Sequence, residues 1–216
     1  MRPSLSLLLV LAVAWIPSGD RDGRPARAHG SPATPPAASA PAAKLPEEIS
    51  YAQLGAHPGR YLGRCVRVRV QVSSWAERWD PFLTRFGSGE FRALDAWSDE
   101  QRLWDEAEFA APAARLFVRR GSAAEWALAE ARRFDRFELE LEVHAVLADR
   151  PWAQVSCVRP LAGGWSEGAL IHAARAADLV ARGASARARE ELDRALRGPL
   201  HPSARRALGE LVAADG

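Results

Sequence analysis

Two stretches of strictly alternating residues constrain the fold of this chain more than any other feature. Residues 66–72 place valine on one side and Arg or Gln on the other, and residues 137–143 alternate Phe, Leu or Val with glutamate. Alternation with a period of two is typical of a half-buried strand in an antiparallel sheet. Because opposite charges on neighbouring strands attract, we expect the two strands to pair, with these charged residues facing one another: Arg67, Arg69, Glu138, Glu140 and Glu142.

Capping residues, turn residues and shorter apolar runs predict the other elements of residues 47–160. Ser50 is a favourable N-cap for a short helix, and Ser122 with Glu125 forms a capping box for a second one. A turn is predicted at residues 149–151. Five strands are predicted, which span residues 64–75, 90–98, 115–119, 136–147 and 152–158. The order is strand, strand, strand, helix, strand, strand, an α+β domain.

This element order, with Tyr61-Leu62-Gly63 and the valines at 66 and 68 opening the first strand, resembles the oligonucleotide/oligosaccharide-binding (OB) fold of small bacterial domains. The resemblance covers residues 47–160 and implies a five-stranded antiparallel Greek-key barrel. It also implies a ligand face on the second and third strands, bordered by the loops that follow strands one and four. A generic five-stranded α+β sheet is the alternative.

Residues 165–216 are predicted to be helical, after a glycine-containing hinge at residues 160–164. Three helices are expected, whose apolar faces carry these residues: Leu170, Ala174, Ala177 and Ala181 in the first, Ala188, Leu192, Ala195 and Leu196 in the second, and Ala204, Leu208, Leu211 and Val212 in the third. The spacing of Ala176, Gly183, Ala188, Leu192, Ala195 and Pro199 resembles one tetratricopeptide (TPR) hairpin. The resemblance implies a helical hairpin plus a third, capping helix, packed on the barrel or on a partner protein; an unrelated helical tail is the alternative.

The N-terminus has the pattern of an export signal. A basic start precedes an apolar run at residues 5–16, too short for a comfortable membrane span. We expect a signal peptide over residues 1–19 and a disordered Pro/Ala-rich linker over residues 20–46. The protein is then exported, periplasmic or secreted. Membrane anchoring by an uncleaved N-terminal segment is the alternative.

The net charge of +2 comes from the N-terminal residues 1–46. Residues 1–46 hold five basic and two acidic residues, whereas the remainder holds 24 arginines against 25 acidic residues. A neutral body makes nucleic acid an improbable partner. The two cysteines, Cys65 and Cys157, invite a disulfide in an exported protein. Strand parity puts Cys65 outward and Cys157 inward, which favours two separate thiols.

No pattern indicates catalysis. The five histidines have no metal-ligand spacing, and the chain lacks a nucleophile elbow and a phosphate-binding loop. His144 is expected at the surface. We therefore predict no enzyme activity, no catalytic residue, no metal and no cofactor.

One group of aromatic and arginine residues is a candidate ligand site. It lies in the loop after the first strand, at the end of the second strand and at the turn between the fourth and fifth strands, and comprises Trp75, Arg78, Trp79, Phe82, Arg85, Trp97, Arg150 and Trp152. Flat aromatic faces stack on sugars or bases, and arginine adds cation–π contacts. Burial of these tryptophans in the core is the competing interpretation. The predicted function is an exported, non-catalytic binding or adaptor protein, with carbohydrate or nucleic-acid binding as the alternative.

Overall fold

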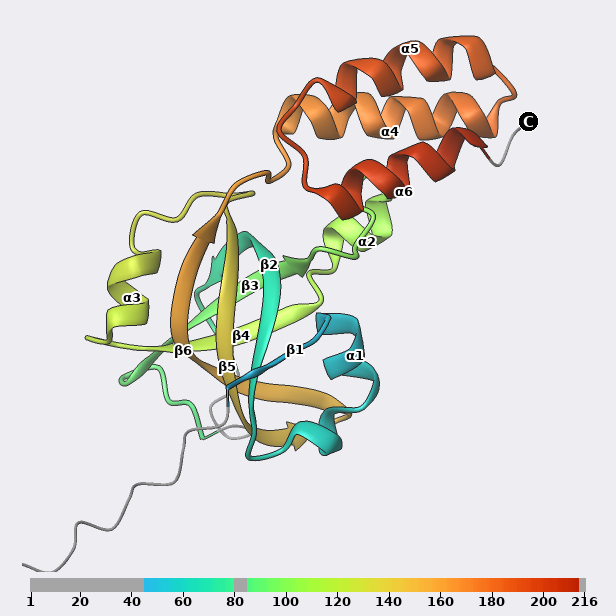
Figure 1. The fold of residues 1–216 in the computed structure, drawn as a ribbon. Helices are drawn as coiled ribbons and strands as arrows, with labels where there is room; N and C mark the ends of the chain where they lie inside the picture. Colours follow the sequence, from blue (N-terminus) through green and yellow to red (C-terminus); the bar gives the residue numbers. More distant parts are fainter. Residues whose placement is uncertain (1–44, 80–84, 214–216) are drawn as a thin grey trace, which may run out of the picture. The chain divides into compact units, whose positions relative to one another are not determined.

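The computed structural model describes residues 45–79 and 85–213, without the side chains of residues 212 and 213. The expected signal peptide, most of the expected linker and Phe82 lie outside these residues. Figure 1 shows an α+β fold. Its elements are β1 (Glu47–Glu48), α1 (Tyr51–Ala56), a 3-10 turn η1 (Pro58–Tyr61), β2 (Cys65–Ala76), β3 (Phe91–Ser98), α2 (Glu106–Ala110), β4 (Ala114–Arg119), α3 (Ala123–Leu128), β5 (Arg136–Leu147), β6 (Arg150–Leu161), α4 (Glu167–Ala181), α5 (Ser185–Leu196) and α6 (Pro202–Ala213).

Five long strands form a closed barrel. Their order is β2-β3-β4-β6-β5, and β2 also pairs with β5, which closes the ring. The predicted order of strands and helix is confirmed. The β4–β6 pair is parallel, whereas the other pairings around the barrel are antiparallel. Alternation within single strands does not encode the direction of a neighbour, so this parallel pair was not expected.

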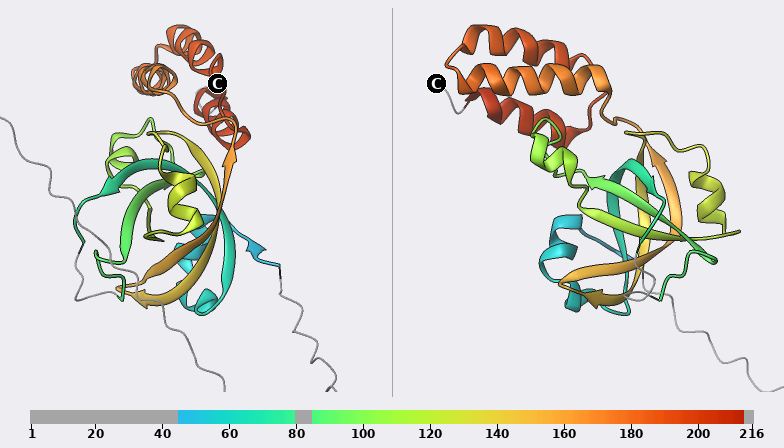
Figure 2. Two further views of the ribbon diagram at one scale, coloured as in Figure 1. Left: turned by 90° about the vertical axis from the view of Figure 1, so that its left-hand side faces the viewer. Right: turned by 180° about the vertical axis from the view of Figure 1, so that it is seen from behind.

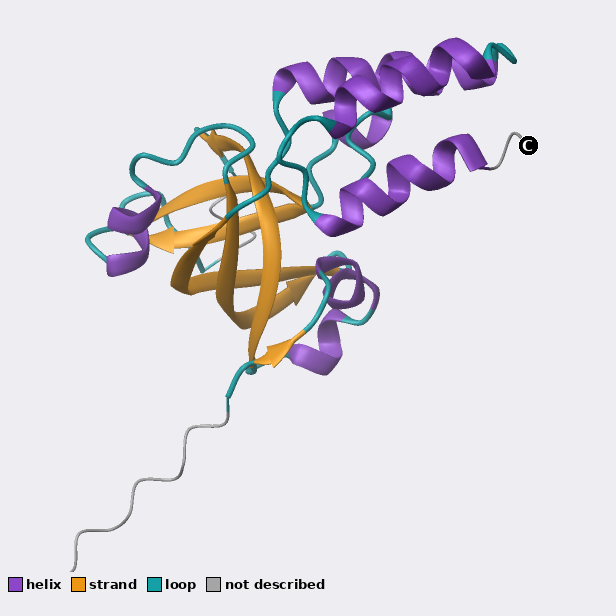
Figure 3. Ribbon diagram, turned by 45° about the horizontal axis from the view of Figure 1, so that its top comes forward, coloured by secondary structure: helices purple, strands orange, loops and turns teal. Residues whose placement is uncertain are grey.

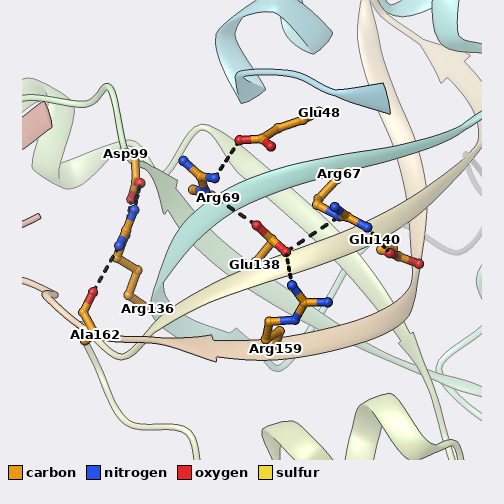
Figure 4. Close-up of polar contacts among 9 residues, drawn as sticks. All are labelled: Glu48, Arg67, Arg69, Asp99, Arg136, Glu138, Glu140, Arg159 and Ala162. Atoms are coloured by element: carbon orange, nitrogen blue, oxygen red, sulfur yellow. Dashed lines mark hydrogen bonds and ion pairs between the residues drawn. The ribbon is translucent and has the colours of Figure 1, made fainter. Parts of the chain in front are cut away.

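The pairing of the two alternating strands is confirmed. Arg67 lies opposite Glu140, and Arg69 lies opposite Glu138. Glu138 is buried among three arginines: Arg159 Nη1 lies 3.1 Å from its carboxylate, and the Nε atoms of Arg67 and Arg69 each lie 3.6 Å away (Figure 4). The valines of the same β2 stretch point into the barrel, where they meet the apolar side of β5. One alternating pattern therefore supplies both the core and an outer charge ladder.

The three C-terminal helices follow the barrel and pack on one another (Figure 3). The expected apolar faces of α5 and α6 are buried at Ala188, Leu192, Ala195, Ala204 and Leu208, whereas Leu196 and Leu211 are partly buried against the same core. The face of α4 was wrong by one position: Ala169, Ala173 and Ala176 are buried, whereas the expected Leu170 face is partly exposed. Alanines occupy two adjacent faces of α4, so periodicity alone could not distinguish them.

The turn between β5 and β6 lies one residue earlier than expected. Ala148 and Asp149 adopt φ values of 47° and 56°, as in a two-residue hairpin turn with both central residues left-handed. Arg150 and Pro151 already belong to β6. Without glycine at either position, the sequence lacked the usual indication of such a turn.

Both cysteines are free and exposed. The inward position expected for Cys157 was wrong, because the register of β6 against β5 slips: Cys157 opposes Glu140, and Val155 opposes the next residue, Leu141. The extra residue is a bulge, which reverses strand parity. The side chain of Cys157 therefore emerges on the outer face.

The glycine segment after β6 packs closely against neighbouring backbone, whereas the sequence predicted a hinge there. A Cβ atom added to Gly164 would lie 2.3 Å from the carbonyl oxygen of Phe134, and Gly163 has a φ of 81°. The small residues permit a near approach of two backbones instead of free motion. The start of the helical segment is therefore packed against the residues that precede β5.

We expect Gly164→Ala to lower the free energy of unfolding by about 1–3 kcal/mol, because the backbone must move to accept a methyl group. Gly168→Ala is the matched control, since nothing lies within 4 Å of its added Cβ and it sits in the first turn of α4. Chemical denaturation measures both. Equal stabilities of the two variants would contradict the close contact.

Candidate functional site

The structure separates the predicted site residues into different surroundings. Trp97 is fully buried between the barrel and the C-terminal helices. Its ring stacks on Phe109 and Phe134 at centroid distances of 5.1 and 5.4 Å, and its indole nitrogen donates to the Phe109 carbonyl. Trp97 is not accessible to a ligand in this structure.

Trp79 and Trp152 belong to a second aromatic cluster on the outer side of β4. Phe117 lies at its centre, with centroid distances of 4.2 Å to Phe86, 5.1 Å to Trp152 and 5.9 Å to Trp79. The Trp79 indole nitrogen donates to the Phe86 carbonyl over 2.7 Å. These contacts attach the described part of the β2–β3 loop to the barrel. The loop thus covers part of the strand surface that it was expected to border.

The remaining predicted residues are spread over the surface. Arg92 lies over the ring of Trp75, with its guanidinium carbon 3.9 Å from the ring centroid. Arg78 and Arg85 are exposed. Two residues of the predicted group, Arg150 and Trp152, line a common cavity that adjoins α1. Their role in ligand binding stays a prediction.

That cavity, which we call the rim cavity, has a volume of about 260 Å³. It lies between α1, the start of β4 and the β5–β6 turn, which Figure 2 shows at the same end of the barrel. It is lined by Tyr51, Gly55, Asp95, Pro112, Ala113, Arg115, Asp149, Arg150, Pro151 and Trp152. The volume is at the small end of ligand pockets and suits a single sugar ring or one side chain.

Three polar side chains of the rim cavity, Asp95, Arg115 and Tyr51, are already paired. Arg115 holds the Asp95 carboxylate through two hydrogen bonds of 2.8 and 3.1 Å. Tyr51 is buried and hydrogen-bonded to the main chain of Arg115, and desolvation raises the pKa of its hydroxyl well above the ordinary value. Tyr51 therefore stays protonated at neutral pH, and the wall of the cavity is uncharged there.

The indole N–H of Trp152 is a buried polar group of the same lining. Its Nε1 atom is buried and finds no hydrogen-bond partner among the described residues. A buried donor without an acceptor costs about 1–3 kcal/mol, and such groups are rare in folded proteins. The Nε1 atom has almost no accessible surface, so a ligand acceptor could pair with it only after neighbouring side chains move aside. Trp152 thus combines a place in the lining of the cavity with a donor that has no partner among the described residues.

Sequence reasoning missed Tyr51, Asp95 and Arg115. The alternation of residues 93–96 places Asp95 on the outer face, and this signal was available. Tyr51 lies in α1, outside the strands that carry the resemblance to the OB fold, so nothing in the sequence linked it to the β5–β6 turn. His144, expected at the surface, is partly buried, with its ring 5.7 Å from that of Phe86.

One serine, histidine and aspartate do meet, between the barrel and α6. His201 is buried; its Nδ1 lies 2.8 Å from Ser203 Oγ, and its Nε2 lies 3.9 Å from Asp99 Oδ1. Asp99 is held by Arg136 through contacts of 3.0 Å to both carboxylate oxygens (Figure 4). We name this group, with Gln71, the junction network.

The His201 ring faces a hydrogen-bond donor at each of its two nitrogens. The Oε1 atom of Gln71 accepts the Trp165 amide over 2.8 Å, so the amino group of Gln71 faces His201 Nε2 at 3.2 Å. On the other side, the Ala204 amide donates to Nδ1 over 3.3 Å, and Ser203 Oγ lies 2.8 Å from the same atom. These contacts join β2, the segment before α4 and the start of α6 through one buried ring.

Among the described residues, no three His, Cys, Asp or Glu side chains converge as a metal site requires. The described helices include none that is long and apolar enough to cross a membrane. No protein-family model matches the chain, and neither a curated protein nor a solved structure matches it. The assignment of function therefore depends on the geometry alone.

Proposed function

We propose that this chain is an exported, non-catalytic binding protein whose barrel holds a small neutral ligand group in the rim cavity. The finer description of the barrel as OB-like is supported by the strand order β2-β3-β4-β6-β5 with α3 between β4 and β5. The β5–β6 turn corresponds to a loop that borders ligands in OB barrels, and β6, which begins directly after it, carries Arg150 and Trp152.

The unpaired indole N–H of Trp152 carries this proposal. Trp152 lines the cavity beside Pro112 and Pro151, and its buried N–H is the donor with which a ligand acceptor would pair after a local movement of the lining. The charged side chains at the rim are two arginines and two aspartates, so their formal charges balance. A neutral group with an acceptor, such as the acetamido group of a glycan, fits better than a phosphate.

The test is a titration of the full-length protein with chitotriose, as a neutral acetamido glycan, and with decathymidylate, as a polyanion. Trp152→Phe keeps the stacked ring and removes the donor, so we expect it to weaken chitotriose binding about tenfold, the value of one hydrogen bond. Trp126→Phe, at an exposed position on α3, is the control and should bind normally. Tighter binding of decathymidylate, or equal affinities of the two variants, would contradict the proposal.

Protein docking by the C-terminal helices is the second candidate function. Its specific support is Ile171, a large apolar residue of α4 that is 51% exposed, beside the partly exposed Leu170. The TPR-like arrangement of α4 and α5, in which buried alanines allow close approach, also supports it. Ile171→Glu should then abolish binding of a purified partner protein without changing chitotriose binding.

A further inference from the structure

The junction network connects the barrel to the helices through one buried imidazole. Gln71 belongs to β2, Arg136 to β5, and Asp99 directly follows β3, whereas His201 directly precedes α6. Arg136 also donates to the carbonyl of Ala162, in the segment that leads to α4. His201 and Gln71 are each 1% exposed, so water does not reach these contacts.

A second proton on His201 would disrupt this arrangement. Nε2 already accepts from the Gln71 amino group, so an added N–H at Nε2 would point at another donor, 3.2 Å away. Gln71 cannot simply turn its amide, because its oxygen is held by the Trp165 amide. Either the His201 ring would have to move away from the Gln71 side chain, or the Gln71 side chain would have to break its hydrogen bond to the Trp165 amide.

We propose that the junction network is an acid-sensitive latch, in which protonation of His201 loosens α4–α6 from the barrel. The charged groups near the ring are Asp99 from the barrel, which attracts an imidazolium at 3.9 Å, and Arg136 from β5, which repels it. On α6, Ser203 is uncharged, and Arg205 is turned to the carbonyls of residues 196, 198 and 200. Since Arg136 neutralises the charge of Asp99, the attraction of Asp99 for a His201 imidazolium does not offset the cost of burying that charge.

The pH range over which docking weakens follows from the direction in which the pKa of His201 is shifted. Desolvation lowers the pKa of His201 in the docked state below its usual range, and Arg136 lowers it further against the opposing effect of Asp99. Above a pH of about 6.5, the pKa of a free histidine, both states are neutral and docking has its full stability. As the pH falls below this value, His201 binds a proton in the undocked state but not in the docked state. Docking is therefore progressively lost.

The experiment measures amide hydrogen exchange of the full-length protein at pH 7.5 and pH 5.5, corrected for intrinsic rates. Amides of α4–α6 should lose protection relative to those of β2 and β5, by at most about tenfold per pH unit for a single proton. His201→Gln, which leaves no ionisable group, should remove this difference. His172→Gln is the control, because His172 pairs with Glu191 between α4 and α5, away from the barrel. Equal pH dependence in wild type and His201→Gln would overturn the proposal.

A direct titration covers the case in which His201→Gln does not dock at any pH. The ring protons of His201 in the wild-type protein are followed by NMR over the same range. Protonation must coincide with the loss of α4–α6 protection. Protonation without any loss of protection, or loss of protection while the ring is still neutral, would equally overturn the latch.

Discussion

Replacing Arg136 with alanine should lower the free energy of unfolding by about 3–5 kcal/mol, because it leaves the carboxylate of Asp99 buried without its partner. The side chains of Arg136 and Asp99 are only 9% and 7% exposed. The same substitution removes the hydrogen bond to Ala162 at the start of the helical segment. Chemical denaturation with urea measures the change.

Arg115→Ala is the matched control for Arg136→Ala. Arg115 holds Asp95 with the same two-pronged geometry, but its side chain is 47% exposed, so solvent screens the pair. We expect a loss of about 1 kcal/mol or less. A similar loss in both variants would mean that burial of the junction network does not determine its contribution.

Trp97→Ala should also cost about 3–5 kcal/mol, because it opens a cavity in the core between the barrel and the helices. Trp97 is fully buried against Phe109 and Phe134, and it shares this core with Trp165 of the segment before α4. Thermal and chemical unfolding of the full-length protein measure the effect. Protection of α4–α6 in hydrogen exchange should fall more than protection of the barrel centre.

Trp126→Ala serves as the control for Trp97→Ala. Its side chain is 74% exposed on α3, so its removal should change stability by less than about 0.5 kcal/mol. If Trp97→Ala were equally mild and instead abolished ligand binding, Trp97 would be a ligand residue and its place in the core would be wrong.

The barrel could be predicted from the sequence because two independent features of β2 and β5 indicate that these strands pair. Residues 66–72 and 137–143 each give an apolar side for the core, and their outer charges are complementary. The pairing of these two strands follows from such patterns, and the order of strands and helices along the chain follows from the capping and turn residues between them. The bulge that turns Cys157 outward does not, because one extra residue in β6 is invisible to a period of two.

The candidate site was predictable only in part, for a physical reason. A tryptophan in a loop or near the end of a strand looks the same in the sequence in both cases. It can be exposed, as a ligand residue would be, or buried, as Trp97 near the end of β3 is. The distinction depends on what packs against it, here Phe109 and residues of the C-terminal segment. The junction network joins residues as far apart as Gln71 and His201, so no local spacing could indicate it.

The central claim, a ligand site at Trp152, is tested most directly by the indole N–H resonances of the full-length protein during titration with chitotriose. An unpaired donor that gains an acceptor moves downfield. The account predicts that the Trp152 resonance shifts saturably in this way, while that of Trp97, already bonded to Phe109, stays in place. A Trp152 resonance that remains fixed while chitotriose binds elsewhere, or the absence of any binding, would contradict it.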